Sequence, residues 1–417
     1  MSTKIRSVCA ALLALILVAA PARAEYSRDE VRAAYAAVSD ASAESPYAEA
    51  PLVAAPYGAG ALTDAARRDA LNMLNFARWL AGLDPVAESR IYNYQCQHGA
   101  VLLAALDAID HNAPQPADMD KNFYDSAHLA TTSGNLARFN WMRPSILREG
   151  VAYFLRDDGE ANLALLGHRR WALNPAMAYT GFGLANSQSG RSYVVMYAHD
   201  TGNAEADWDA VCWPSAGAFP AELMHADLAW SVTLNPDVYD LDRSTIAVTL
   251  SEAGSGLRFA FAPGDGDCLI NADGYGGGPC LIFRPDFSAT AFADYEQNQR
   301  WTVHVTGLTR RDGETATLEY AVDMISLHVE DVANLEVSLL EARLVTGETL
   351  RLSAAVIPAY ADDLSVQWLS SDESVARVDA DGLVTALRPG QCQIIAHSAN
   401  GRSDACALTV SAAEPSN

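Results

Sequence analysis

The sequence predicts a multidomain α+β protein in which an α/β/α sandwich is followed by two all-β sandwich domains. Two observations predict this architecture. Up to about Asn174 and Pro175 the apolar residues recur at the three- and four-residue spacing of helices, and beyond that proline they alternate as they do in strands. The length of 417 residues suits about three domains of roughly 150 residues each. Hydrophobic residues make up 50% of the chain and charged residues 19%, which is typical of a folded protein.

The region before the proline contains the predicted sandwich of helices and sheet. A leader, residues 25–62, precedes this first domain, residues 63–203. Thr63 is suited to cap a helix, and Gly82 ends it. Because helices then flank a small sheet, a layered sandwich is expected. The predicted helices cover about 26–38, 63–81, 94–110, 144–156 and 163–173, and the predicted strands cover 179–185 and 192–199.

The region after residue 203 consists of short alternating segments interrupted by Gly, Asp and Pro. We predict a central β-sandwich over residues 204–328, a second β domain over 335–411, and a frayed end at 412–417. The glycines between 274 and 278 lack the lysine and the helix that follow a phosphate-binding loop. They are therefore predicted to form a loose hairpin.

The formal net charge is −24 at pH 7. A surface this negative repels the phosphates of nucleic acids and the head groups of anionic lipids. We therefore expect neither nucleic-acid binding nor electrostatic docking to a membrane.

The first 24 residues have the pattern of a secretory signal peptide. Lys4 and Arg6 precede an apolar run over residues 8–20, and residues 22–24 supply the small side chains of a cleavage site. The apolar run is short for a membrane span, and no second run of about 20 apolar residues follows. We expect a secreted protein, extracellular or associated with the cell envelope, with no transmembrane segment.

The cysteines predict disulfides. Of the seven in the chain, six remain after the predicted signal peptide, and an even count in an exported protein favours pairing. Free buried thiols are the alternative. No two cysteines have CxxC spacing, so a metal site made of cysteines is not expected. The predicted pairs, chosen for short loops within one domain, are Cys268 with Cys280 and Cys392 with Cys406, which leaves Cys96 with Cys212.

A ten-residue motif connects the first domain with a known family. Residues 166–175 read LGHRRWALNP and resemble the GHRRxxLNP signature of the bacterial branch of the CAP superfamily, which includes cysteine-rich secretory proteins, antigen 5 and pathogenesis-related proteins. Residues 70–78 resemble the first helix of that family, with its LNxxNxxR pattern. The resemblance covers about residues 63–203 and implies a CAP-like α/β/α sandwich.

A second resemblance covers the C-terminal domain. Residues 346–348, 366–371, 375–379 and 382–386 are similar to the pattern of bacterial Ig-like group 2 domains, which occur in surface proteins and adhesins. Trp368 on an alternating strand is suited to a sandwich core, and a glycine at 382 suits a hairpin turn. The resemblance implies a spacer or an adhesive surface.

The CAP resemblance also implies a site. In the family two histidines meet across a cleft between helices and sheet, and some members bind zinc there. Two imidazoles can share a metal, or one can act as a base. Where many members have Gly-Glu-Asn, residues 133–135 of this chain read Ser-Gly-Asn, so that glutamate is absent. The expected cleft residues are His111, His168, Asp158, Ser133, Asn135 and Arg169, with His111 and His168 as candidate zinc ligands and no residue assigned as catalytic.

Three functions remain open at this point. We expect a binding or cell-envelope interaction role, in which His111 and His168 hold a small or extended ligand such as an envelope polymer or a protein. A metal-assisted hydrolase acting on peptide or cell-wall material is the alternative, although it needs a base, an orienting group and an open metal position. In the third reading both histidines are structural. Arg169 either bonds to acids and backbone carbonyls or reaches an anionic group of the ligand.

Overall fold

The computed structural model describes residues 25–38 and 45–413, which form two compact units. The first contains the residues up to Tyr295 together with Gln299–Asp323, and the second contains Glu296–Asn298 together with the chain from Met324 onward. Within the described ranges, no helix combines enough length with enough apolar character to span a membrane. The predicted signal peptide and residues 414–417 of the predicted frayed end lie outside the described residues.

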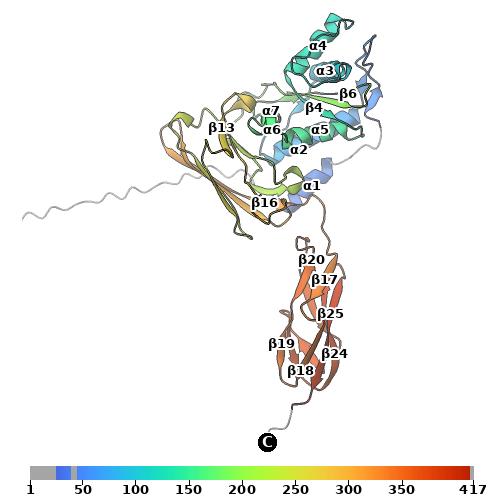
Figure 1. The fold of residues 1–417 in the computed structure, drawn as a ribbon, viewed down its shortest axis with the longest axis vertical. Coiled ribbons are helices and arrows are strands. Elements are labelled where there is room, and N and C mark those ends of the chain that lie inside the picture. Colours follow the sequence, from blue (N-terminus) through green and yellow to red (C-terminus); the bar gives the residue numbers. More distant parts are fainter. Residues whose placement is uncertain (1–24, 39–44, 414–417) are drawn as a thin grey trace, which may run out of the picture. The chain divides into compact units, whose positions relative to one another are not determined.

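The first part of the first unit, here called the helical region, has three layers. Its middle layer is an antiparallel sheet of strand order β4-β7-β6. Figure 1 shows α3 and α4 on one face of this sheet and α5 with α2 on the other. The principal elements are α2 (Asp64–Leu80), α3 (Arg90–Leu106), α4 (Lys121–Thr132), α5 (Ile146–Arg156), β4 (Gly134–Phe139), β6 (Phe182–Asn186) and β7 (Ser192–Tyr197). The sequence patterns did not predict α4 and β4.

Alternate residues of β7 explain why both faces of the sheet are covered. Tyr193 and Val195 are fully buried in the core shared with α3 and α4. Val194 points the other way, and its side chain lies so close to Gly150 of α5 that a Cβ there would be 2.8 Å from it. The period of two therefore supplies each helical layer with its own apolar contacts.

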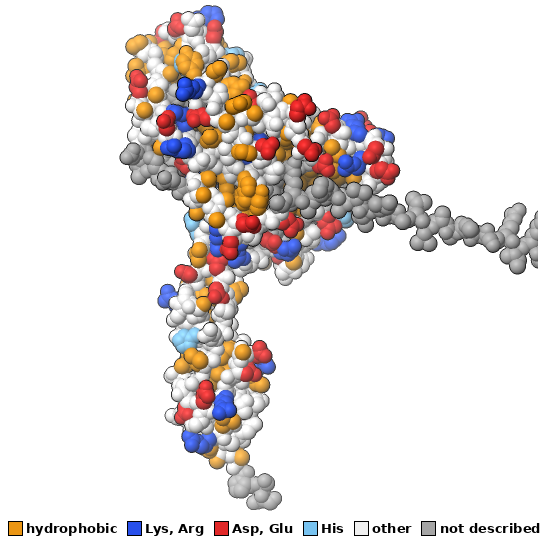
Figure 2. Space-filling view, turned by 180° about the vertical axis from the view of Figure 1, so that it is seen from behind, with side chains coloured by type: hydrophobic (Ala, Val, Ile, Leu, Met, Phe, Trp, Pro, Cys, Tyr) orange, Lys and Arg blue, Asp and Glu red, His pale blue; other side chains and the backbone are white. Residues whose placement is uncertain are grey.

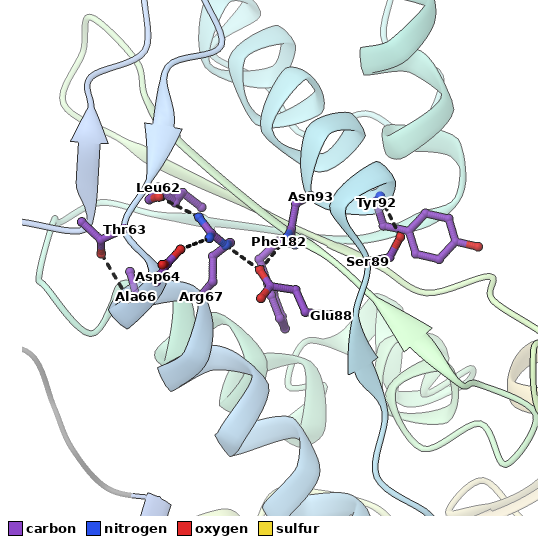
Figure 3. A network of polar contacts seen from close by, with 10 residues as sticks. All are labelled: Leu62, Thr63, Asp64, Ala66, Arg67, Glu88, Ser89, Tyr92, Asn93 and Phe182. Carbon is purple, nitrogen blue, oxygen red and sulfur yellow. Dashed lines mark hydrogen bonds and ion pairs between the residues drawn. The ribbon is translucent and has the colours of Figure 1, made fainter.

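A polar network holds the start of α3 against α2 and β6 (Figure 3). Arg67 of α2 pairs with Asp64 and with Glu88, and Glu88 also accepts a hydrogen bond from Asn93 of α3. The Asn93 side-chain oxygen accepts the backbone N–H of Phe182 at 2.9 Å. Since these groups satisfy one another, the network is structural, and it fixes the helix that leads to the turn containing His111.

Shorter elements surround these layers. They are α1 (Arg28–Val38), α6 (Glu160–Leu163), α7 (Gly167–Ala172), β1 (Tyr47–Glu49), β2 (Ala61–Leu62), β3 (Ala87–Glu88) and β5 (Tyr179–Thr180). The predicted helix near residues 26–38 thus corresponds to α1, and the predicted helix over 163–173 corresponds to the shorter α7, since α6 ends where that prediction begins.

The rest of the first unit, here called the β region, consists of two antiparallel sheets with strand orders β12-β11-β15-β16-β9 and β13-β14-β10-β8. Trp230 of one sheet packs against Trp301 of the other, with ring centroids 6.2 Å apart. Both indoles are fully buried, so the sheets share an aromatic core. The strands are β8 (Ala210–Trp213), β9 (Gly217–Pro220), β10 (Trp230–Leu234), β11 (Ala247–Glu252), β12 (Arg258–Phe261), β13 (Cys268–Asn271), β14 (Cys280–Phe283), β15 (Arg300–Thr309) and β16 (Thr315–Ile325).

The second unit is all β in the part that the structure describes. Its larger sheet has the order β18-β25-β24-β21, and Trp368 of β21 is part of two apolar clusters, as the alternation predicts. The strands are β17 (Asn334–Val337), β18 (Glu341–Val345), β19 (Thr349–Arg351), β20 (Ala354–Ile357), β21 (Val366–Ser370), β22 (Ala376–Val378), β23 (Leu383–Ala386), β24 (Gly390–Ser398) and β25 (Ser403–Ser411).

The predicted disulfides are wrong, because no two cysteines are bonded to each other within the described residues. Cys268 lies opposite Phe283 and Cys280 lies opposite Asn271, at the other end of the ladder. Three residues along a strand are about 10 Å, which exceeds the Cα separation that a disulfide bridges. The alternative of free thiols therefore applies. Cys392 and Cys406 are also two residues out of register, and Cys96 and Cys212 lie on α3 and β8.

Candidate functional site

The GHRR motif forms α7, a helix of six residues that begins after Leu166. Successive side chains of a helix diverge by about 100°, so neighbouring residues face different surroundings. The side chain of His168 is 18% exposed, whereas Arg169 and Arg170 are 1% and 2% exposed. The motif therefore presents its histidine to solvent and directs both arginines into the protein.

His168 is held by a buried carboxylate. Its Nδ1 donates to Asp157 Oδ1 at 2.8 Å, and the Asp157 side chain is completely buried. The other carboxylate oxygen accepts the backbone N–H of Arg169 at 3.2 Å. This pairing fixes the ring and leaves Nε2 as the free acceptor of the imidazole. The family resemblance places Asp158 in the cleft, whereas the structure shows that Asp157 is the aspartate that pairs with His168.

Asn135 contacts the backbone of His168. It is 2% exposed on β4, and its side-chain amide donates to the backbone oxygen of His168 at 2.8 Å. Asn135 therefore positions the backbone of α7 and does not face a ligand. The backbone carbonyl oxygen of Ser133, two residues earlier, accepts hydrogen bonds from the backbone N–H groups of Ala198 and His199 at 3.0 and 3.2 Å. Both predicted cleft residues thus connect β4 to its neighbours.

His111 lies in an exposed turn after α3. Its Nδ1 donates to the carbonyl oxygen of Thr131 at 2.8 Å, which again leaves Nε2 as the free acceptor. Thr131 is near the end of α4, four residues before Asn135. The short segment from Thr131 to Asn135 therefore connects the partner of His111 with the partner of His168.

His199 is a third histidine of the site, and the sequence does not predict it because the spacing of His199 does not indicate a metal ligand. Its backbone follows β7, which pairs with the start of β4. Burial, and next the charge of His111, lower the pKa of His199. Its ring packs on Trp171, one turn after His168 on α7, with centroids 4.2 Å apart. We call His111, His168 and His199 the histidine site.

The histidine site does not have the donors of a zinc centre. Zinc sites in proteins have at least three protein ligands. In the described parts of the chain, no three His, Cys, Asp or Glu side chains lie close enough together to hold a metal ion. Both oxygens of Asp157 are already engaged by His168 and Arg169. The residues therefore do not fit zinc.

Arg169 lies at the junction of the helical region with the β region, not in the histidine site. It donates to the carbonyl oxygens of Leu155 at 2.6 Å, Arg156 at 2.8 Å and Ala229 at 2.7 Å. Burial lowers its pKa to about 10. The structure thus supports the alternative in which this arginine bonds to backbone carbonyls, and its guanidinium is not exposed to a ligand.

Comparison with known proteins identifies one domain. Residues 331–410 match the family model of the bacterial Ig-like domain (group 2), which confirms the predicted Ig-like domain. Two curated relatives match short segments: a 3-O-alpha-D-galactosyl-alpha-L-arabinofuranosidase of Bifidobacterium longum, 43% identical over 76 residues, and a Lacto-N-biosidase of Bifidobacterium bifidum, 44% identical over 64 residues. The matches cover 18% and 15% of this chain but only 7% and 6% of those relatives.

Two solved structures show weak likenesses to this chain. Domains 1–6 of the surface layer protein SbsC are 10% identical, with a TM-score of 0.17, over 46% of this chain and 25% of that chain. The titin domains z1z2 in complex with telethonin are 12% identical, also with a TM-score of 0.17, over 48% of this chain and 93% of that chain. At these TM-scores the likenesses carry no argument about function.

Proposed function

We propose that residues 63–203 form a CAP-superfamily domain that binds an extracellular ligand at the histidine site. One observation carries the proposal: a fully buried carboxylate, Asp157, orients the partly exposed imidazole of His168. Burying a carboxylate costs free energy, and hydrogen bonds to partners such as His168 must offset this desolvation cost. The GHRR motif and the three-layer arrangement of helices and sheet support the family assignment.

The free ring nitrogens indicate which ligands suit the site. Nδ1 of His111 and Nδ1 of His168 are bonded to the protein, and within the described residues neither Nε2 has a protein partner. Neutral imidazoles present these nitrogens as acceptors for hydroxyl or amide donors. On the face shown in Figure 2, Lys and Arg side chains of the first unit lie among Asp and Glu side chains and form no basic stripe. With a net charge of −24, the protein favours neutral ligands over anionic ones.

The cellular setting is part of the same proposal. The N-terminal pattern and the Ig-like domain support a secreted or envelope-associated protein, in which the Ig-like domain acts as a spacer or an adhesive surface. A neutral component of the cell envelope, either a polymer or a protein, is then the natural class of ligand.

A hydrolase is the second candidate, and the same pair of residues favours it. A buried carboxylate that orients a histidine is the arrangement by which enzymes prepare a general base. Asp157 and His168 supply that pair. The chemistry would use His168 Nε2 to accept a proton from an attacking water.

Binding and cleavage assays on the full-length protein test both candidates. We expect soluble peptidoglycan fragments with amidated carboxyl groups to bind, and His168→Ala to weaken the binding at least tenfold. His225→Ala is the matched control, because His225 also lies beside an aspartate, at 3.4 Å from Asp294, but belongs to the β region. Equal binding by wild type and His168→Ala would contradict the proposal. Cleavage of peptides or peptidoglycan that disappears in a folded His168→Ala variant would establish the hydrolase instead.

A further inference from the structure

We infer that Tyr275, contributed by the β region, extends the histidine site, and that this composite site binds a neutral oligosaccharide. The inference rests on the proposed function and adds a residue and a ligand class to it. Tyr275 lies in the glycine-containing loop between β13 and β14, more than 100 positions after His168 in the sequence.

The loop lies directly against α7. Gly276 has a φ of +59°, and a Cβ at this position would be 2.2 Å from the carbonyl oxygen of Arg170. A Cβ at Gly278 would similarly lie 2.3 Å from the carbonyl oxygen of Leu234. Only glycine permits this approach of two backbones. The loop, predicted to be a loose hairpin, is therefore closely packed.

Arg170 holds both ends of the loop by hydrogen bonds. Its guanidinium donates to the Asn271 side chain at 2.5 Å, where the loop begins, and to the Gly278 carbonyl oxygen at 2.8 Å, where it ends. The same guanidinium lies 5.3 Å from the centre of the Tyr275 ring, within cation–π distance. Since Arg170 is itself 2% exposed, it acts as a positioning residue that holds Tyr275 in place.

Tyr275 continues a row of aromatic rings that begins at His199. Its ring lies edge-on to Trp171, with centroids 6.3 Å apart and an angle of 75°. Trp171 packs on His199, with ring centroids 4.2 Å apart. The row therefore runs from His199 through Trp171 to Tyr275, with one ring just after β7, one on α7 and one in the β region.

The polar atoms of Tyr275 and Trp171 are available to bond to a ligand. Within the described residues neither the Tyr275 hydroxyl nor Trp171 Nε1 has a hydrogen-bond partner, and neither atom is among the buried atoms that lack one. Each ring is half-buried, so it presents part of an apolar surface and one polar tip. Aromatic side chains with a wet polar end are typical of ligand-binding surfaces.

A neutral sugar chain suits this surface better than other ligands. A pyranose ring has a C–H face that packs on an aromatic ring and a rim of hydroxyls that can bond to a phenol, an indole N–H or an imidazole. The row is several rings long, so it suits an oligosaccharide rather than one sugar. Repulsion by the net charge of −24 disfavours acidic sugars.

Calorimetric titration of the full-length protein tests the inference. The probes are an N-acetylglucosamine hexamer and cellohexaose as neutral chains, a galacturonate hexamer as the anionic chain, and an uncharged decapeptide. We expect a neutral chain to bind, and Tyr275→Ala to weaken it about tenfold, with a smaller loss for Tyr275→Phe. Tyr94→Ala is the control, because Tyr94 is 57% exposed and its ring contacts His98 instead of the row.

The outcomes separate this inference from the proposed function. If His168→Ala abolishes binding but Tyr275→Ala does not change it, the histidine site stands and the contribution of Tyr275 is overturned. If only the decapeptide or the galacturonate hexamer binds, the assignment of a neutral oligosaccharide as the ligand is overturned. If Tyr275→Ala weakens binding and His168→Ala does not, the proposed function fails and Tyr275 remains a binding residue. Absence of binding by every probe overturns the inference, whereas binding of peptidoglycan fragments then keeps the proposed function.

Discussion

The first unit and the Ig-like domain are built in different ways. The first unit buries charged groups, among them Asp157 and the guanidinium groups of Arg78, Arg169 and Arg170. Between residues 331 and 410, all of which the structure describes, Ser398 is the only buried polar side chain. A buried charge is costly unless its hydrogen bonds are satisfied, whereas an apolar core needs only complementary shapes. We infer that the buried charged groups of the first unit maintain a specific arrangement of its elements, which the apolar core of the Ig-like domain does not require.

That geometry is the position of α7. A helix of six residues is too short to be stable alone, so its neighbours must hold it. Arg78 donates to the carbonyl oxygens of Ala172 and Asn174 at its C-terminal end, at 3.2 and 2.9 Å. Arg169 ties α7 to α5 and the β region, and Arg170 ties it to the loop of Tyr275. Three arginines thus place the helix that carries His168 and Trp171.

The largest effect is expected from Arg169→Ala. Its removal leaves the carbonyl oxygens of Leu155, Arg156 and Ala229 without their donor in the interior, which should lower the free energy of unfolding by about 4 kcal/mol. Chemical denaturation followed by tryptophan fluorescence measures this change. Arg377→Ala, at an exposed position of the Ig-like domain, is the matched control and should have little effect. A similar loss in both variants would contradict the comparison.

A somewhat smaller effect is expected from Ile394→Ala in the Ig-like domain. Ile394 lies on β24 and is fully buried in an apolar cluster of the Ig-like domain. Its truncation should therefore lower the free energy of unfolding of that domain by about 3 kcal/mol. Ligand binding by the histidine site should not change. Ile394→Val, which removes one methyl group, should cost about 1 kcal/mol in the same denaturation experiment. Loss of ligand binding in Ile394→Ala would show that the Ig-like domain takes part in the site.

The features that could be predicted from the sequence are encoded in contiguous residues. The motif at 166–175 indicated His168, and the alternation around Trp368 indicated the Ig-like core. The resemblance also indicated His111, although no local signal shows that its partner is the carbonyl oxygen of Thr131. The helix α4 lacks a long apolar face, since only Ala127, Ala130 and Thr131 of its residues are buried, and so its pattern was missed.

The features that could not be predicted depend on local backbone direction or on strand register. Asp157 has a φ of +53° at the end of α5, and this left-handed turn decides which of two adjacent aspartates faces His168. His199 reaches the site because β7 pairs with β4, and Tyr275 reaches it through a loop that follows more than 100 residues later. The same dependence on register separates Cys268 from Cys280, which the count of cysteines could not show.

The smallest effect concerns the pKa of His199 and tests whether the histidine site is coupled. Burial and the charge of His111 both hold this pKa below its ordinary value of 6.5. The unfolded chain therefore binds more protons in the pH window between the folded-state pKa and 6.5, so the stability contributed by His199 rises with pH across that window.

In an NMR titration, His111→Gln should raise the pKa of His199 toward 6.5, although the lowering caused by burial should remain. His304→Gln, on β15 of the β region, should leave the titration of His199 unchanged. If His111→Gln also leaves it unchanged, His111 and His199 do not share a site.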